Sequence, residues 1–288
     1  MTATPGPAPI RDESVRVRAD DGAEADLRMI APSSADAPLL YWLPALGVTA
    51  RSYVAFAYAL ASRGVAVALH EWRGGGSSDR RAGRHVDWGY RDLLRRDLPA
   101  GFGAARDVLG ARALLLGGHS LGGQLALLSA ALPPYPPRRI VLVASGAPWW
   151  RAFPHRHLVR AVLHAAPVIA RVRGYFPGRR LGFGGNEARG VISDWARSGR
   201  TGRYAVDGIG DLEQALARCR VQVDAWRLAD DWLGPAASLD WLLGKLPQAE
   251  RRVTVLDDAA LGTRADHFSW MKEPARLATA IADAIDGP

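Results

Sequence analysis

The stretch that decides the fold is residues 113–130, ALLLGGHSLGGQLALLSA, in which one serine stands among glycines. The apolar run before the serine is typical of a buried strand, and the residues after it carry apolar side chains at helical spacing. Residues 118–122 match the pattern G-x-S-x-G, with Ser120 at the centre. In such a strand-to-helix turn the glycines allow close approach of the two elements, and the strained serine presents its Oγ at the helix N-terminus. The stretch therefore predicts that Ser120 is a nucleophile.

The same alternation of short apolar runs and helical periods continues along most of the chain, as expected for βαβ units and a mostly parallel sheet. We predict eight strands, at residues 15–19, 25–30, 39–43, 65–70, 113–117, 140–144, 221–226 and 253–256. Helices are predicted at residues 50–62, 88–109, 121–131, 236–246 and 273–285. The first two strands alternate polar and apolar residues, which indicates an antiparallel hairpin at the edge of the sheet. The fold class is α/β.

One interval, residues 147–218, breaks the alternation because no clear strand interrupts it. A loop of this length inside a compact domain is implausible. We therefore predict a helical cap inserted at 147–218, with a helix near residues 157–171. The α/β core then consists of residues 13–146 and 219–288, and residues 1–12 are predicted to be a disordered tail.

Composition narrows the class of protein. The chain has 288 residues, 48% of them hydrophobic, which is enough for a substantial core. Its net charge of +8 comes mainly from arginines spread along the sequence, so no nucleic-acid partner is predicted. The single Cys219 excludes an intrachain disulfide and a multi-cysteine metal site. No signal-peptide pattern and no run of about 18 apolar residues occurs, so we expect a cytoplasmic protein without a membrane span.

Several motifs besides G-x-S-x-G carry a family resemblance. They are LPALGV at residues 43–48, HEWRGGGSS at 70–78, GYFPGRRLGFGG at 174–185 and DWARSGR at 194–200. With these, the chain from about residue 38 onward resembles the α/β-hydrolase superfamily, and within it a bacterial group of largely uncharacterised serine hydrolases. The resemblance implies a mostly parallel eight-stranded sheet, no cofactor, and catalytic residues in the order serine, acid, histidine. A serine at residue 120 argues against the haloalkane dehalogenases and epoxide hydrolases of this fold, which need an aspartate there.

A serine hydroxyl is a weak nucleophile and needs a base, which an acid must orient. His267 is the predicted base, because it follows the last predicted strand by eleven residues and precedes the final helix. His119 is expected to pack away from the reacting face. The remaining histidines after the serine fall in the insertion, where we expect solvated side chains: His155, His157 and His164.

The acid is expected just beyond the strand at residues 221–226. In the superfamily it usually lies four residues before a proline that opens the next helix, and Pro235 selects Asp231. Asp230 is the alternative, and only one of the two can serve because neighbouring side chains of an extended segment point in opposite directions. Other carboxylates are weaker candidates: Asp224, Asp257, Asp258 and Asp266.

The oxyanion formed during acyl transfer needs two backbone donors. The resemblance places one donor, the N–H of Leu121, directly after the nucleophile. It places the other in the turn after the third strand, where many relatives have His-Gly followed by an apolar residue. Here residues 44–47, PALG, stand in that place, and the N–H of Leu46 is the expected donor. For substrate binding, Trp149 and Trp150 are predicted to line the entrance under the cap and to favour an apolar acyl or alkyl group. Packing of these tryptophans between cap and core is the alternative.

The predicted function is hydrolysis of a carboxylic ester, or of a thioester or amide, through an acyl-enzyme on Ser120. An acyltransferase, cyclase or lyase of a biosynthetic pathway could use the same three residues, and a non-catalytic ligand-binding protein could share the fold. No H-E-x-x-H pattern or Cys/His cluster occurs, so no metal is predicted. The expected partner is a small-molecule substrate, and the sequence leaves the oligomeric state open.

Overall fold

The structure is a computed structural model that describes residues 9–134 and 136–287. Eight strands form one sheet in the order β1-β2-β4-β3-β5-β6-β9-β10, and each corresponds to a predicted strand. Their bounds are β1 (Ile10–Arg18), β2 (Glu24–Pro32), β3 (Leu39–Leu43), β4 (Ala66–Leu69), β5 (Leu114–His119), β6 (Arg139–Val143), β9 (Gln222–Leu228) and β10 (Glu250–Leu256). The predicted tail lies mostly outside the described residues, and its predicted end is too late, because residues 10–12 belong to β1.

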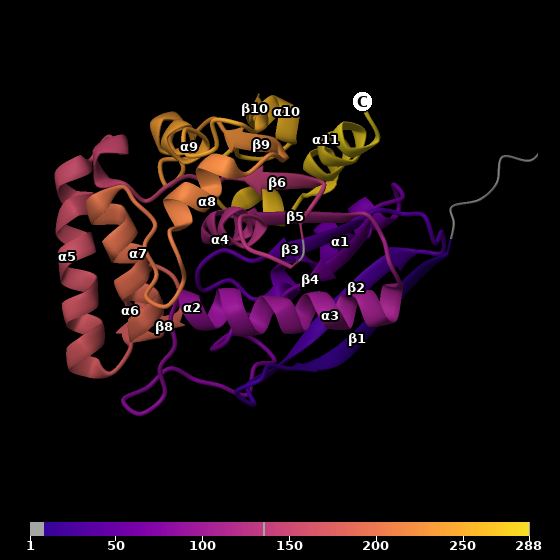
Figure 1. Cartoon of the computed structure of the whole chain (residues 1–288). Coiled ribbons are helices and arrows are strands. Elements are labelled where there is room, and N and C mark those ends of the chain that lie inside the picture. Colours follow the sequence, from indigo (N-terminus) through magenta and orange to yellow (C-terminus); the bar gives the residue numbers. More distant parts are fainter. Residues whose placement is uncertain (1–8, 135, 288) are drawn as a thin grey trace, which may run out of the picture.

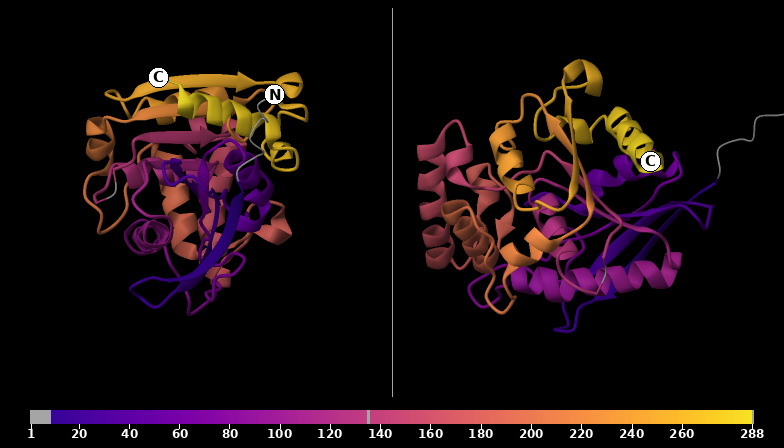
Figure 2. Two further views of the ribbon diagram at one scale, coloured as in Figure 1. Left: turned by 90° about the vertical axis from the view of Figure 1, so that its right-hand side faces the viewer. Right: turned by 45° about the horizontal axis from the view of Figure 1, so that its top comes forward.

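The sheet is mostly parallel, which confirms the predicted fold class. β1 pairs antiparallel with β2, as the alternating pattern at the N-terminus indicated, and β2 also pairs antiparallel with β4. The strands from β4 to β10 pair in parallel. The sheet twists strongly between β10 and the β1–β2 hairpin (Figure 2, left).

Helices cover both faces of the sheet, so the central strands are buried on both sides. In β3, Leu39, Tyr41 and Leu43 face one hydrophobic cluster, whereas Leu40 and Trp42 face the other. The helices of the core and its connections are η1 (Ala50–Tyr53), α1 (Val54–Ala61), α2 (Tyr90–Asp92), η2 (Leu93–Asp97), α3 (Leu98–Leu109), α4 (Leu121–Ala130), α9 (Ala236–Leu243), α10 (Asp258–Leu261), η4 (Ser269–Met271) and α11 (Ala275–Asp286). α1 and α11 pack on the Trp42 face, and α3, α4 and α9 pack on the Tyr41 face.

Residues 147–218 connect β6 to β9 and are mainly helical. They contain η3 (Trp150–Ala152), α5 (Arg156–Arg173), β7 (Phe176–Pro177), α6 (Gly178–Leu181), β8 (Asn186–Glu187), α7 (Arg189–Thr201) and α8 (Leu212–Arg218). Figure 1 shows α5, α6 and α7 together at the left end of the molecule, beyond the ends of the parallel strands. The helix predicted at residues 157–171 is α5, whereas the β7–β8 ladder has only two residues in each strand and leaves no sequence pattern.

Helix α4 approaches β3 and β5 so closely that side chains are excluded between them. A Cβ on Gly122 would overlap the carbonyl oxygen of Leu43, and a Cβ on Gly118 would overlap the backbone of Gly122. A Cβ on Gly123 would lie 2.5 Å from Ser145 Oγ. These glycines are therefore needed for the closeness of the backbone rather than for a left-handed conformation.

We predict that Gly122→Ala lowers the free energy of unfolding by about 3 kcal/mol or more, because the added methyl group would push α4 away from the backbone of β3. The matched control is Gly103→Ala in α3, where an added Cβ would have no atom within 4 Å. It should be stabilising by about 0.5–1 kcal/mol, as expected for removal of a helical glycine. Urea denaturation followed by circular dichroism measures both; equal stabilities for the two variants would contradict the packing argument.

Candidate active site

Ser120 occupies the turn between β5 and α4 in a strained conformation. Its φ of 55° and ψ of −119° lie in a region that residues other than glycine rarely adopt. The surrounding structure holds this conformation: the Ser120 N–H donates to Val143 O at 3.1 Å, and Ser145 Oγ donates to Ser120 O at 2.7 Å. The half-buried serine side chain is therefore displayed at the N-terminus of α4, where the helix dipole favours negative charge.

Asp231 and His267 form a buried pair on the loops after β9 and β10. Asp231 Oδ2 lies 2.8 Å from His267 Nδ1, and the aspartate side chain is fully buried. Its Oδ1 accepts hydrogen bonds from the N–H groups of Leu233 at 2.9 Å and Gly234 at 3.0 Å. A carboxylate can only accept, so Nδ1 of His267 carries the proton and Nε2 is left as the acceptor.

The pair lies against the Ser120 turn. The ring of His267 is 4.7 Å from the ring of His119, the residue before the serine. His119 is fully buried, and its Nδ1 is 2.9 Å from Tyr53 Oη. Burial lowers the pKa of His119 well below its usual value, so this ring stays neutral and packs beneath the turn. The structure thus places the Asp231–His267 pair against His119, the residue before Ser120, although the pair and the serine are far apart in sequence.

The other carboxylates and histidines considered for these roles have other environments. Asp230 is exposed and Asp224 is paired with Arg139 at 2.9 Å. The remaining carboxylates accept backbone N–H groups in loops and caps: Asp257 from Ala260, Asp258 from Ala265, and Asp266 from Phe268 and Ser269. The three histidines of the insertion are exposed: His155, His157 and His164.

The turn at residues 44–47, which carries the Leu46 N–H, is held from three sides. Tyr53 Oη accepts the Ala45 N–H at 3.0 Å, and the indole N–H of Trp72 donates to Pro44 O at 2.9 Å. On the third side Gly47, at φ +74°, has no room for a Cβ because the backbone of residues 184–185 lies against it. Within the described part of the chain, the N–H groups of Leu46 and Leu121 donate to no acceptor. Both can therefore bind an oxyanion, whereas the roles of Tyr53 and Trp72 left no local signal in the sequence.

A cavity of about 540 Å³, its open mouth included, touches both Leu46 and Leu121. Its apolar walls include Trp72, Trp88 and Val191. The insertion also contributes three polar side chains: Arg179, Asn186 and Glu187. Burial raises the pKa of Glu187, whose Oε1 accepts the Gly185 N–H at 2.7 Å. The cavity is therefore mainly apolar, with one polar side supplied by the insertion.

Trp149 and Trp150 do not line this cavity, and each is engaged by another side chain. Trp149 stacks on Trp241 of α9 with ring centroids 3.7 Å apart. Trp150 lies beneath the guanidinium group of Arg160, 5.1 Å from the ring centroid. Trp149 therefore packs between the insertion and the core: its flat ring lies beside Gly202 and fills the space between α7 and α9.

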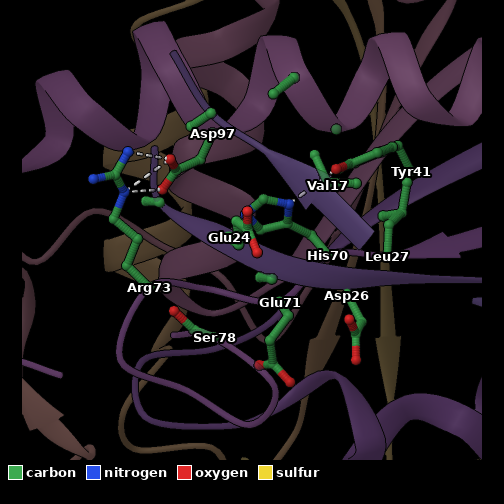
Figure 3. A pocket seen from close by; sticks show the side chains of 15 residues that line it. Val17, Glu24, Asp26, Leu27, Tyr41, His70, Glu71, Arg73, Ser78 and Asp97 are labelled. Atoms are coloured by element: carbon green, nitrogen blue, oxygen red, sulfur yellow. Dashed lines mark hydrogen bonds and ion pairs between the residues drawn. The ribbon is translucent and has the colours of Figure 1, made fainter. Parts of the chain in front are cut away.

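A second cavity lies under the β1–β2 hairpin, and Figure 3 shows the polar side chains that line it. Tyr41 Oη is 2.9 Å from His70 Nδ1, and Arg73 pairs with Asp97 at 2.6 Å. Burial raises the pKa of Glu71 to about 7. Ser120, Asp231 and His267 line neither cavity, but only the first cavity includes Leu121, the residue next to Ser120. No metal-binding cluster of three or more His, Cys, Asp or Glu occurs in residues 9–134 and 136–287. No helix in the described ranges is long and apolar enough to cross a membrane.

Tyr53→Phe tests how the turn at residues 44–47 is held. The change leaves the Ala45 N–H and His119 Nδ1 without their buried partner, and we expect a loss of about 1–3 kcal/mol of stability and a lower kcat at nearly unchanged KM. Tyr58→Phe is the matched control, since Tyr58 is exposed and its hydroxyl donates to Asp12 at the surface. Thermal denaturation and ester hydrolysis measure both variants; a Tyr53→Phe protein as active as the control would refute the positioning role.

Comparison with solved structures places the fold among known hydrolases. A hydrolase from Pseudomonas aeruginosa PA01 superposes with a TM-score of 0.62 at 20% identity, over 96% of this chain and 99% of that one. An esterase from Exiguobacterium antarcticum gives 0.64 at 15% identity, over 96% and 100% of the two chains. A haloalkane dehalogenase from Agrobacterium tumefaciens C58 gives 0.63 at 14%, over 95% and 96%. Because these proteins differ in chemistry, the likeness shows the fold alone.

No curated protein matches the sequence. A sequence model of the serine aminopeptidase S33 family matches residues 39–201, which is more than half of the chain and includes the Ser120 turn and most of the insertion. The protein is therefore an α/β-hydrolase enzyme that belongs to the serine aminopeptidase S33 family.

Proposed function

We propose that the protein hydrolyses carboxylic esters through an acyl-enzyme on Ser120, with His267 as base and Asp231 as the acid that orients it. The observation that carries this proposal is the buried Asp231–His267 pair, 2.8 Å apart, packed against the strained Ser120 turn. Burial of the pair gives it no plausible surface role, and the strain at the serine is of the kind found at active sites. The esterases among the similar folds agree with this proposal.

In the first half of the reaction, Nε2 of His267 takes the hydroxyl proton of Ser120 while Oγ bonds to the carbonyl carbon of the ester. The carbonyl oxygen becomes an oxyanion, which the N–H groups of Leu46 and Leu121 bind. Asp231 holds the imidazolium through Nδ1 and stays ionised. Collapse of the intermediate breaks the bond to the alcohol oxygen, which leaves with the proton from Nε2.

In the second half, water attacks the acyl group and gives its proton to Nε2. The same oxyanion site stabilises the second intermediate. The bond between the acyl carbon and Ser120 Oγ then breaks, Oγ takes the proton back, and the carboxylic acid departs. No cofactor or metal is required by this sequence of steps.

The cavity beside Leu46 and Leu121 supports a substrate with an apolar acyl or alkyl group. Trp72, Trp88, Leu93, Leu125 and Val191 contribute apolar side chains to its wall. In this proposal the insertion at residues 147–218 acts as the cap, because its segment around Gly185 and Glu187 closes one side of the same cavity.

Ser120→Ala should abolish ester hydrolysis and labelling by a fluorophosphonate probe without changing the fold, because only Oγ is lost. The measurements are hydrolysis of p-nitrophenyl esters of graded chain length and gel fluorescence of the probe. Ser129→Ala is a control, since Ser129 is buried on α4 away from the turn. Persistent labelling of Ser120→Ala would show that another residue is the nucleophile.

Asp231→Asn should lower kcat by a factor on the order of 10⁴, as the same change does in a well-studied triad, because the wrong tautomer of His267 is then held. Asp230→Asn, one residue earlier and exposed, should leave kcat within about twofold. Steady-state kinetics on the preferred ester decides between the two carboxylates. If Asp230→Asn were the damaging change, the assigned acid would be wrong.

Product analysis separates hydrolysis from the other uses of the same three residues. With an added alcohol or amine, a hydrolase gives mainly the free acid, whereas an acyltransferase gives mainly the new ester or amide. Aminoacyl anilides belong in the substrate panel, because the family is named for aminopeptidases and the Glu187 carboxyl lies in the cavity wall. Cleavage of anilides with no cleavage of esters would replace the ester proposal.

A further inference from the structure

Helix α5 presents an apolar surface to solvent on the side opposite its packed face. Leu158, Val162, Val168 and Val172 are 63%, 37%, 62% and 69% exposed. At about 100° per residue, these side chains fall within an arc of about 120° around the helix, which makes a broad row along its length. Ala161 and Ala165 are exposed too and lie in the same row. We call this row, from Leu158 to Val172, the outer face of α5.

The outer face of α5 is separate from the side of the helix that packs against the rest of the protein. The inner side of α5 is already buried: Leu163, Ala166 and Ala170 are within 2% of full burial, and the last two pack with Phe176 and Ile192. The helix therefore has two apolar sides, of which only one is used by the fold. Single exposed aliphatic side chains are common on protein surfaces. A row of them, in contrast, marks a surface that interacts with a protein or a membrane.

The charge beside this row has one sign. Residues 156–186 contain Arg156, Arg160, Arg171, Arg173, Arg179 and Arg180 and no Asp or Glu. Within the described part of the chain, none of the four arginines on α5 forms an ion pair, whereas arginines on β1 and β2 such as Arg16 and Arg28 pair with carboxylates. Arg171 and Arg173 flank Val172, about 100° to either side of it around the helix, so their charge borders the row and is available to an anionic partner. Arg156 lies roughly opposite the row, and Arg160 covers the Trp150 ring.

We propose that the outer face of α5 docks on the surface of an anionic phospholipid bilayer. Aliphatic side chains in a row with arginines beside them match the boundary between acyl chains and negatively charged head groups, where a surface helix lies in the plane of the membrane. Figure 1 shows α5 as the outermost helix at its end of the molecule, so a flat surface can reach it. This proposal does not depend on the reaction assigned to Ser120.

Two other partners fit less well. A second copy that packed α5 against α5 would bring like charges together without a carboxylate to balance them. A nucleic acid would engage the arginines but would leave the aliphatic row in contact with water and phosphate, and α5 has no Phe, Tyr or Trp for base stacking.

The test is co-sedimentation of the full-length protein with vesicles of phosphatidylcholine alone and of phosphatidylcholine mixed with phosphatidylglycerol. Wild-type protein should sediment with the anionic vesicles and less with the neutral ones, and added salt should weaken binding. Leu158→Gln/Val168→Gln/Val172→Gln should abolish sedimentation. Arg171→Gln/Arg173→Gln should weaken it about 25-fold, at about fivefold for each arginine.

Matched controls lie elsewhere on the molecule. Val253→Gln/Val255→Gln changes two valines on β10 that are 48% and 51% exposed, and Arg106→Gln/Arg138→Gln removes two exposed arginines away from α5. Both should bind vesicles like wild type. All variants should keep their circular dichroism spectrum and their activity on a short soluble ester, which separates lost docking from lost folding or catalysis.

Three results would overturn the proposal. The first is equal binding of wild type and the α5 variants, or no preference for anionic vesicles. The second is a dimer in light scattering that the triple glutamine variant converts to a monomer, with no vesicle binding by either. The third is binding of a DNA duplex that depends on Arg171 and Arg173 while vesicles are ignored.

Discussion

The arrangement around Ser120 depends on how closely the first turn of α4 lies against β3 and β5. At Gly118 and Gly122 only backbone fits, so the carbonyl of Leu43 and the peptide groups of α4 are in direct contact. This contact fixes where β5 ends and where α4 begins, and the serine between them has to take a positive φ. A side chain at Gly118 or Gly122 could not be accommodated by a change of rotamer, since any added atom would have to displace backbone rather than a side chain.

The same contact brings the two candidate oxyanion donors together. Leu43 is the last residue of β3, and the turn with Leu46 begins immediately after it. Fixing Leu43 against α4 therefore fixes the distance between the Leu46 and Leu121 N–H groups, with Tyr53 and Trp72 holding the orientation of the turn. The strain at Ser120 and the placing of the turn at residues 44–47 beside α4 are consequences of one backbone contact.

The sequence is informative wherever a pattern is local. Short apolar runs, with period-two alternation in the first two, locate the eight strands. Helical spacing locates α4, and the glycines of residues 117–123 identify the Ser120 turn. The offset to Pro235 singles out Asp231, the carboxyl that the structure places beside His267. Stacking of Trp149 on Trp241 and the bond from Trp72 to Pro44 join residues 92 and 28 positions apart, respectively, and no local pattern encodes such contacts. The direction in which Trp149 and Trp150 point is likewise not encoded locally, because an aromatic residue in an insertion reveals its size but not its orientation.

One contact ties the insertion to the core by main chain alone. The backbone of Gly184 and Gly185 rests on Gly47, with no side chain between the two segments that could rotate to absorb a shift. This contact restricts which insertions the fold can accept. A different insertion between β6 and β9 would need its own pair of small residues next to Gly47. Without them it would tilt the peptide planes of the turn at residues 44–47. Sequence change in the segment of the insertion that lines the cavity beside Leu46 and Leu121 is therefore limited by the contact with Gly47. Parts of the insertion away from this contact are not limited in this way.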